Sequence, residues 1–149
     1  MTYLTANFTL EEFITSETAA RRGIDNTPND EVKDNLLQLA QTMEQVRYVL
    51  GNKPIISKSG YRSPKLNAAI GGAKNSQHIL GQADDFICPQ FGSPAEICRE
   101  IMHCSNIKFD QLICEGSWVH LSIADVPRME VLTAHFKNGK VTYTSGLND

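Results

Sequence analysis

The stretch Ser76-Gln77-His78-Ile79-Leu80-Gly81-Gln82-Ala83-Asp84-Asp85 places a histidine and an aspartate on either side of a glycine. The glycine favours a bend after His78, and the apolar run that follows Asp85 favours a strand. Such a bend lets both side chains converge on one point. A histidine and an aspartate at this spacing are common in proteins, so a second segment must decide how the pair is interpreted.

The second segment is Glu115-Gly116-Ser117-Trp118-Val119-His120. Alternate residues of a strand point to opposite faces, so the run 118–123 has one apolar face for the core, while His120 lies on the other face. Together with His78 and Asp85 it offers two imidazoles and one carboxylate. This is the ligand set of a catalytic zinc site with one open position. Taken alone, His120 is equally well interpreted as a structural histidine.

Upstream of these segments the pattern is helical. Thr9 and Glu12 have the spacing of a capping box, and a second short helix is expected to end at Gly23. Apolar residues at steps of three and four then predict a long helix over residues 30–50, with one stripe facing the core. We interpret this region as packing structure.

The rest of the chain alternates strands with short helices. The Asn138-Gly139 pair predicts a final hairpin. Helices followed by mostly antiparallel strands predict an α+β fold, with N-terminal helices packed on a central sheet, and no linker divides the single domain expected over residues 1–149. The elements expected after residue 50 are strands over 54–59, 83–88, 110–114, 118–123, 131–136 and 141–144, and helices over 64–70 and 94–105.

The composition indicates a globular chain: 149 residues, 41% hydrophobic and 21% charged, with a net charge of −3. The charge offers no basic face for nucleic acid, and the apolar runs are too short to cross a bilayer. Residues 1–5 lack the features of a signal peptide, so we expect synthesis in a cytoplasm. We expect a monomer without nucleic-acid partners or membrane insertion.

We expect the remaining histidines and the cysteines to have structural roles and not to bind metal. His103 falls on a predicted helix and His135 on a late strand, and neither is expected to bind metal. The cysteines form no CxxC pair, so we expect reduced, buried side chains that behave as small hydrophobes. These cysteines are Cys88, Cys98, Cys104 and Cys114.

The motif Ser76-x-His78-x-x-Gly81-x-Ala83-x-Asp85 resembles the signature of the M15 family of zinc D-Ala-D-Ala carboxypeptidases and related endolysin peptidases. The segment 59–64 (Ser-Gly-Tyr-Arg-Ser-Pro) is similar to that family's preceding Ser-Gly-Tyr-Arg, and residues 118–120 to its closing Trp-x-His. The resemblance extends from about Asn7 to the final hairpin and is strongest to the single-domain, phage- and prophage-encoded branch. It implies the α+β fold of D-Ala-D-Ala carboxypeptidases and hedgehog-like domains.

The resemblance implies zinc bound by His78, Asp85 and His120, and places Arg62 near the substrate carbonyl. A guanidinium can stabilise the oxyanion that develops as water attacks, or grip a terminal carboxylate. The alternative for Arg62 is an exposed arginine in a turn. The residues expected to orient ligands or contact substrate are Ser76, Gln77, Tyr61 and Trp118.

The general base is where the chain departs from the family. Many members carry an acid three positions before the last histidine, and here Ser117 occupies that position. Glu115 is the nearest carboxylate, and a bulged Gly-Ser turn would return it to the site, so we assign it the base role. Asp84 and Asp110 compete for this role. As a strand residue, however, Asp84 should point away from the site, and Asp110 can pair structurally instead.

The implied function is zinc-dependent hydrolysis of D-amino-acid-containing stem peptides of peptidoglycan, of the D-Ala-D-Ala carboxypeptidase type. One alternative is an endolysin-type L,D-endopeptidase, which would need an open groove. Another is a catalytically silent zinc- or wall-binding module, which Ser117 suggests. A third is a structural protein of a phage particle that uses the fold for assembly. For the peptidase, the expected place of action is the bacterial cell wall, reached by phage-assisted release.

Overall fold

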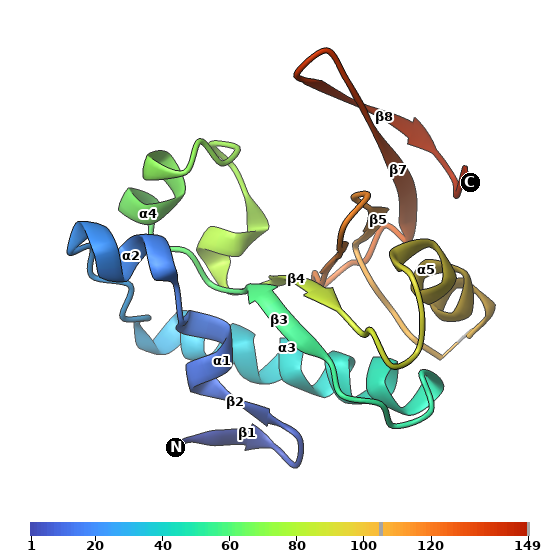
Figure 1. Cartoon of the computed structure of the whole chain (residues 1–149). Helices are drawn as coiled ribbons and strands as arrows, with labels where there is room; N and C mark the ends of the chain where they lie inside the picture. Colours follow the sequence, from blue (N-terminus) through green and yellow to red (C-terminus); the bar gives the residue numbers. More distant parts are fainter. Residues whose placement is uncertain (105, 149) are drawn as a thin grey trace.

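The computed structural model describes residues 1–104 and 106–148, and the helices and strands are mixed along the chain, which confirms the α+β class (Figure 1). In these residues the helices are α1 (Leu10–Ile14), α2 (Glu17–Arg22), α3 (Asp30–Val49), α4 (Pro64–Ala69), the 3-10 helix η1 (Gln77–Leu80) and α5 (Pro94–His103). The strands are β1 (Tyr3–Thr5), β2 (Phe8–Thr9), β3 (Ile56–Ser59), β4 (Ala83–Ile87), β5 (Gln111–Cys114), β6 (Val119–Ser122), β7 (Glu130–Lys137) and β8 (Lys140–Ser145).

The central sheet has the order β3-β4-β6-β5-β7-β8. The neighbouring strands are antiparallel except β5 and β7, which run parallel, so the predicted mostly antiparallel sheet is confirmed. β1 and β2 form a separate small ribbon at the N-terminus. In this order β3 and β8 are the two edges, and β4 and β6 lie next to one another inside the sheet.

The core lies between α3 and one face of the sheet. The stripe of α3 that includes Leu36, Leu39 and Met43 is fully buried, as are Phe86 on β4 and Leu121 on β6. Each such side chain stabilises the fold by roughly 1.5–3 kcal/mol relative to an exposed one. Because this packing occupies one face of β4 and β6, the alternate residues of both strands are left for the opposite face.

The predicted helix caps are present. The Thr9 hydroxyl accepts from the Glu12 amide while the Glu12 carboxylate accepts from the Thr9 amide, and a second box caps α5. α2 ends at Gly23, whose φ of 64° is left-handed and suits glycine. The two capping boxes and Gly23 therefore correctly predicted the starts of α1 and α5 and the end of α2.

Some boundaries differ from the predictions. His78, for which only a following bend was predicted, lies in the short helix η1, because the Ser76 hydroxyl caps this helix and Gly81 ends it with φ 71°. The ribbon β1–β2 was not predicted, since strands of two and three residues are too short to show a period. α5 ends at His103, and the predicted helix end at residue 105 lies outside the described residues.

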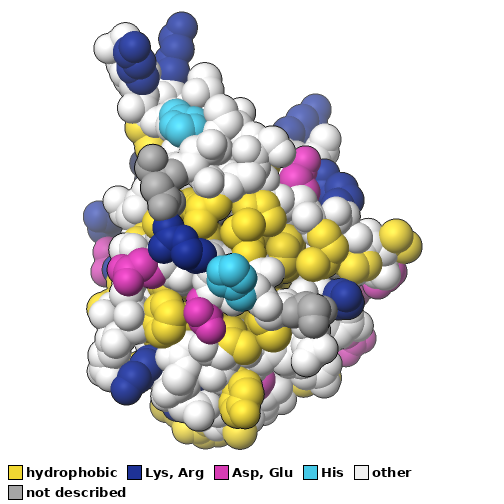
Figure 2. Space-filling view, turned by 90° about the vertical axis from the view of Figure 1, so that its right-hand side faces the viewer, with side chains coloured by type: hydrophobic (Ala, Val, Ile, Leu, Met, Phe, Trp, Pro, Cys, Tyr) yellow, Lys and Arg dark blue, Asp and Glu magenta, His cyan; other side chains and the backbone are white. Residues whose placement is uncertain are grey.

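The cysteines are free thiols; Cys88, Cys98 and Cys114 are buried, as predicted, whereas Cys104 is only partly buried. Figure 2 shows the face that carries α5 and the β7–β8 hairpin, where apolar side chains gather between charged side chains of both signs. Among the described residues, no helix has both the length and the apolar character needed to span a membrane.

Candidate metal centre

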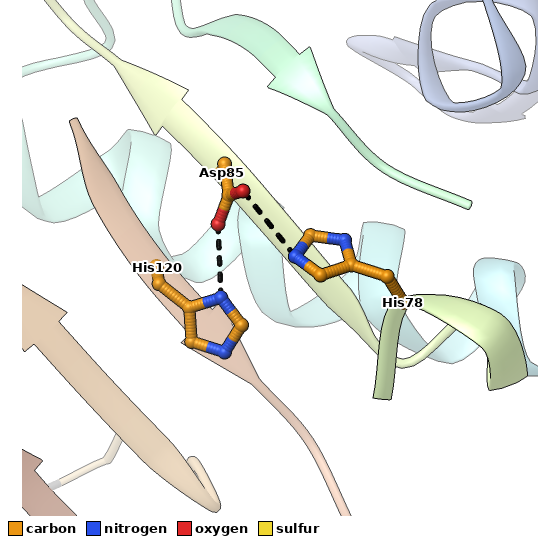
Figure 3. Close-up of side chains that lie close together, drawn as sticks. All are labelled: His78, Asp85 and His120. Atoms are coloured by element: carbon orange, nitrogen blue, oxygen red, sulfur yellow. Dashed lines mark hydrogen bonds and ion pairs between the residues drawn. The ribbon is translucent and has the colours of Figure 1, made fainter. Parts of the chain in front are cut away.

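Three elements bring the predicted ligands together (Figure 3). His78 comes from η1, Asp85 from β4 and His120 from β6, where Asp85 and His120 are paired across the antiparallel strands. Asp85 Oδ1 lies 2.9 Å from His120 Nδ1, and its Oδ2 lies 3.3 Å from His78 Nε2. One ligand atom from each residue lies within 4.8 Å of the others, and within the described part of the chain these three side chains form a group that could hold a metal ion.

The orientation of His78 is set by the backbone of a neighbouring segment. Its Nδ1 lies 2.7 Å from the carbonyl oxygen of Gly60. A carbonyl can only accept, so Nδ1 carries the proton and Nε2 is directed to Asp85. A histidine held in this way, with one ring nitrogen on a carbonyl and the other free for an ion, is typical of metal sites.

The charge of the cluster also suits a cation. Burial opposes the ionisation of Asp85, but hydrogen bonds from His120 and His78 outweigh it and hold the pKa of this carboxyl well below its usual value. Asp85 is therefore a carboxylate between two imidazoles. Zinc takes these ligand types, and three protein ligands leave a fourth position for water, so the donor set fits a catalytic zinc ion.

Glu115 reaches the site from the tight turn between β5 and β6. Its amide donates to the Trp118 carbonyl at 3.0 Å, and Gly116 has a φ of 84°. Ile113 pairs with His120, and Glu115 lies two residues further along the chain, directly after β5, so it shares the face of the sheet that carries His120. Its side chain lines the cleft that contains the ligands, whereas Ser117 is exposed in the turn.

The environment of Glu115 makes its carboxylate a stronger proton acceptor than an exposed glutamate. Burial raises the pKa of the Glu115 carboxyl, the charge of His120 opposes this rise, and the charge of Asp85 adds to it. A base with a raised pKa is better matched to proton transfer than an ordinary exposed carboxylate.

Arg62 is half-buried on the same cleft, at the chain segment that leaves β3. Its amide donates to the His78 carbonyl at 3.0 Å, which fixes the arginine beside η1. Burial lowers the pKa of the guanidinium and the charge of Asp85 raises it. Its Nε is buried without a hydrogen-bond partner. The arrangement is not that of an exposed turn arginine.

The two competing carboxylates are held by other side chains, Asp84 on the core side of the sheet and Asp110 at the wall of the cleft. Asp84 is fully buried on the core side and accepts from the Ser57 hydroxyl at 2.6 Å. Burial raises the pKa of Asp84 well above its usual value. Both oxygens of Asp110 accept from the Arg128 guanidinium, at 2.9 and 2.7 Å. Glu115 is therefore the candidate base whose carboxylate lines the cleft without such a partner.

The other predicted residues divide between the cleft and the core. Ser76 and Trp118 line the cleft, as does Gln77, whose amide donates to Asp110 Oδ2 at 3.1 Å. Tyr61 does not line this cleft. It is buried in the core, where its amide donates to the Phe13 carbonyl, because that contact turns the chain after β3 inward.

The cleft has a volume of about 800 Å³ and extends from the Gly71-Gly72 loop to the β7–β8 hairpin. Several features of the site were not predicted from the sequence. The Gly60 carbonyl lay inside the quoted Ser-Gly-Tyr-Arg segment, so that motif could have indicated it. Arg128 and Tyr143 carried no signal, because only the strand order brings them to this cleft.

Comparison with known proteins agrees with this geometry. The family model described as Peptidase M15 matches residues 6–122. A curated relative, the zinc D-Ala-D-Ala carboxypeptidase of Streptomyces albus G, is 39% identical over 51 residues. That alignment covers 34% of this chain and 20% of the relative, so the two proteins share only part of their lengths.

Proposed function

Since this chain belongs to the peptidase M15 family, we propose that it is a zinc-dependent peptidase that hydrolyses D-amino-acid-containing stem peptides of peptidoglycan. The zinc ligands are His78, Asp85 and His120. The observation that carries the proposal is their convergence in a cleft that also contains Glu115 and Arg62. The place of action is the bacterial cell wall, where such peptides occur.

Zinc bound by this cluster supplies a Lewis acid that polarises a carbonyl and lowers the pKa of water toward about 7. The residues of the chain do the rest. Glu115 accepts the proton of the attacking water and passes it to the leaving amine, a role worth roughly 10²–10⁴-fold in rate. The raised pKa of Glu115 supports this assignment.

Arg62 stabilises the negative charge that develops on the carbonyl oxygen. Its guanidinium lies in a partly buried setting, where a charge acts more strongly than in water, and its backbone is fixed to His78. The same group can instead bind the terminal carboxylate of a stem peptide. Ser76 keeps η1, and with it His78, in place.

The D-Ala-D-Ala carboxypeptidase activity named for the Streptomyces relative is the first candidate for the bond cleaved. The second candidate is an endopeptidase that cuts within the stem peptide. The extent of the cleft, from the Gly71-Gly72 loop to the β7–β8 hairpin, supports it because a chain can extend to both sides of the ligands.

The test is digestion of a defined stem pentapeptide and of intact peptidoglycan by the zinc-loaded protein, with product masses identified and chelator-treated protein as control. Release of terminal D-alanine supports the carboxypeptidase, and internal fragments support the endopeptidase. A protein that binds zinc with one-to-one stoichiometry and cleaves neither material is a silent binding module, which would refute the proposal.

A further inference from the structure

The β7–β8 hairpin brings a phenol to the cleft from outside the part of the chain that matches the family. Tyr143 lies on β8 and lines the cleft that contains His78, Asp85 and His120. The match to Peptidase M15 ends at residue 122, so family membership assigns this residue no role.

Strand register places Tyr143 level with Glu115. Ile113 pairs with Leu132 across the parallel strands β5 and β7, so the residues two further along, Glu115 and Ala134, are neighbours on the same face. Ala134 in turn pairs with Tyr143 on β8. Glu115, which directly follows β5, Ala134 on β7 and Tyr143 on β8 therefore lie in one row.

Ala134, the middle residue of this row, leaves space for the Tyr143 side chain to extend toward Glu115. Neighbouring strands are about 4.8 Å apart, so Tyr143 starts about 10 Å from the strand of Glu115. Ala134 is buried and carries only a methyl group, so a tyrosine side chain can extend over it. Burial raises the pKa of Tyr143, and the charges of Glu115 and Asp85 add to this, so the phenol is protonated and can donate.

A close contact holds the hairpin beside the turn that carries Glu115. A Cβ built on Gly116 would lie 3.1 Å from Cε2 of Phe136, so the Phe136 ring covers this glycine. Phe136 and Tyr143 lie on the same face of the hairpin, because Ala134 lies two residues before Phe136 and pairs with Tyr143. The phenol therefore has a defined position relative to Glu115.

The hydroxyl of Tyr143 has no hydrogen-bond partner within residues 1–104 and 106–148, and the side chain is 48% exposed. A protonated phenol without a partner, at the wall of a cleft, is available to a ligand. Arg62 follows β3 at one edge of the sheet and Tyr143 lies on β8 at the other, with the strands of Asp85 and His120 between them.

We propose that Tyr143 is a substrate-binding residue whose hydroxyl donates a hydrogen bond to a backbone carbonyl of the peptide, on the side of the metal ligands away from Arg62. This inference rests on the proposed function. A peptide that crosses the ligands meets Arg62 at one end and Tyr143 at the other. The hairpin thereby contributes to substrate selection.

The test compares wild type with Tyr143→Phe, which keeps the ring and removes the hydroxyl, and with Tyr48→Phe, a control on the exposed side of α3. Hydrolysis of a stem pentapeptide gives kcat and KM. Binding is followed separately by fluorescence of Trp118, the single tryptophan, in a Glu115→Gln background that does not turn over.

Loss of one neutral hydrogen bond predicts binding weaker by roughly 3- to 10-fold, seen as a rise in KM, with zinc content and thermal midpoint unchanged. Tyr48→Phe should match wild type. If Tyr143→Phe binds and cleaves as wild type does, the inference is wrong while the proposed function stands. If wild type neither binds nor cleaves the peptide, the proposed function fails and takes this inference with it.

Discussion

The Nδ1–H of His78 donates to the carbonyl oxygen of Gly60 at 2.7 Å, and this bond joins the metal centre to the segment that leaves β3. The amide of Arg62 returns a bond to the His78 carbonyl at 3.0 Å. The two contacts fix a proposed metal ligand and the cationic residue of the cleft to one another. The Ser-Gly-Tyr-Arg segment is therefore part of the candidate metal site through its backbone.

Gly60→Ala should disturb this arrangement. A Cβ at residue 60 would run into the backbone of Phe13, so the segment must shift, and overpacking of this kind costs about 1–3 kcal/mol. Displacing a group that orients a ligand typically weakens metal binding by roughly 10–100-fold. We expect a lower urea midpoint and weaker zinc binding in competition with a chromophoric chelator.

Gly139→Ala is the matched control for that substitution. Its Cβ would meet nothing within 4 Å, while its φ of 74° imposes backbone strain alone. Its zinc affinity should equal that of wild type. If Gly60→Ala also binds zinc normally, the Gly60 carbonyl does not set the orientation of His78.

Arg62→Lys should keep zinc and lose activity. Lysine retains the charge but lacks the planar fork, and removal of one oxyanion donor typically lowers kcat by roughly 10²–10³-fold. Arg21→Lys, on the exposed side of α2, is the control. If the difference in activity between Arg62→Lys and wild type disappears with C-terminally amidated peptide, Arg62 binds the terminal carboxylate. If Arg62→Lys has wild-type kinetics with both peptides, Arg62 neither stabilises the oxyanion nor binds the carboxylate.

Asp110→Asn should reduce stability in a pH-dependent way. Hydrogen bonds from Arg128 lower the pKa of Asp110 below the 3.8 of the unfolded chain, with burial opposing. Its contribution is therefore present above pH 3.8 and is lost as the pH falls through the lower folded value. Because this carboxylate is buried, we expect a loss of about 2 kcal/mol at pH 7.

Urea unfolding of zinc-free protein at several pH values measures this effect. The difference between wild type and Asp110→Asn should shrink as the solution is acidified, and exposed Asp125→Asn should show no difference at any pH. If the difference in the free energy of unfolding between wild type and Asp110→Asn stays constant with pH, Asp110 stabilises the fold through its shape and not through its charge.

The sequence was sufficient for the parts of the site that depend on local pattern. Alternation along β6 correctly separated buried Val119 and Leu121 from His120, and the capping boxes gave correct helix starts. Alternation also predicted that Asp84 faces away from the cleft, as it does.

The sequence was insufficient where the site depends on strand order. Tyr143 and Arg128 reach the cleft because β7 pairs with β5 in parallel, a long-range choice that no local period encodes. Tyr61 was assigned to the site from its position in a motif, but the contact of its amide with Phe13 takes it into the core.

The role of Glu115 as the base of a zinc peptidase is tested most directly by hydrolysis of a stem pentapeptide. The proteins compared are zinc-loaded wild type, Glu115→Gln and the exposed control Glu31→Gln. Zinc content is determined on all three. We predict that Glu115→Gln keeps its zinc and loses roughly 10²–10⁴-fold in kcat, while Glu31→Gln matches wild type. If Glu115→Gln binds zinc and cleaves the peptide at the wild-type rate, Glu115 is not the general base.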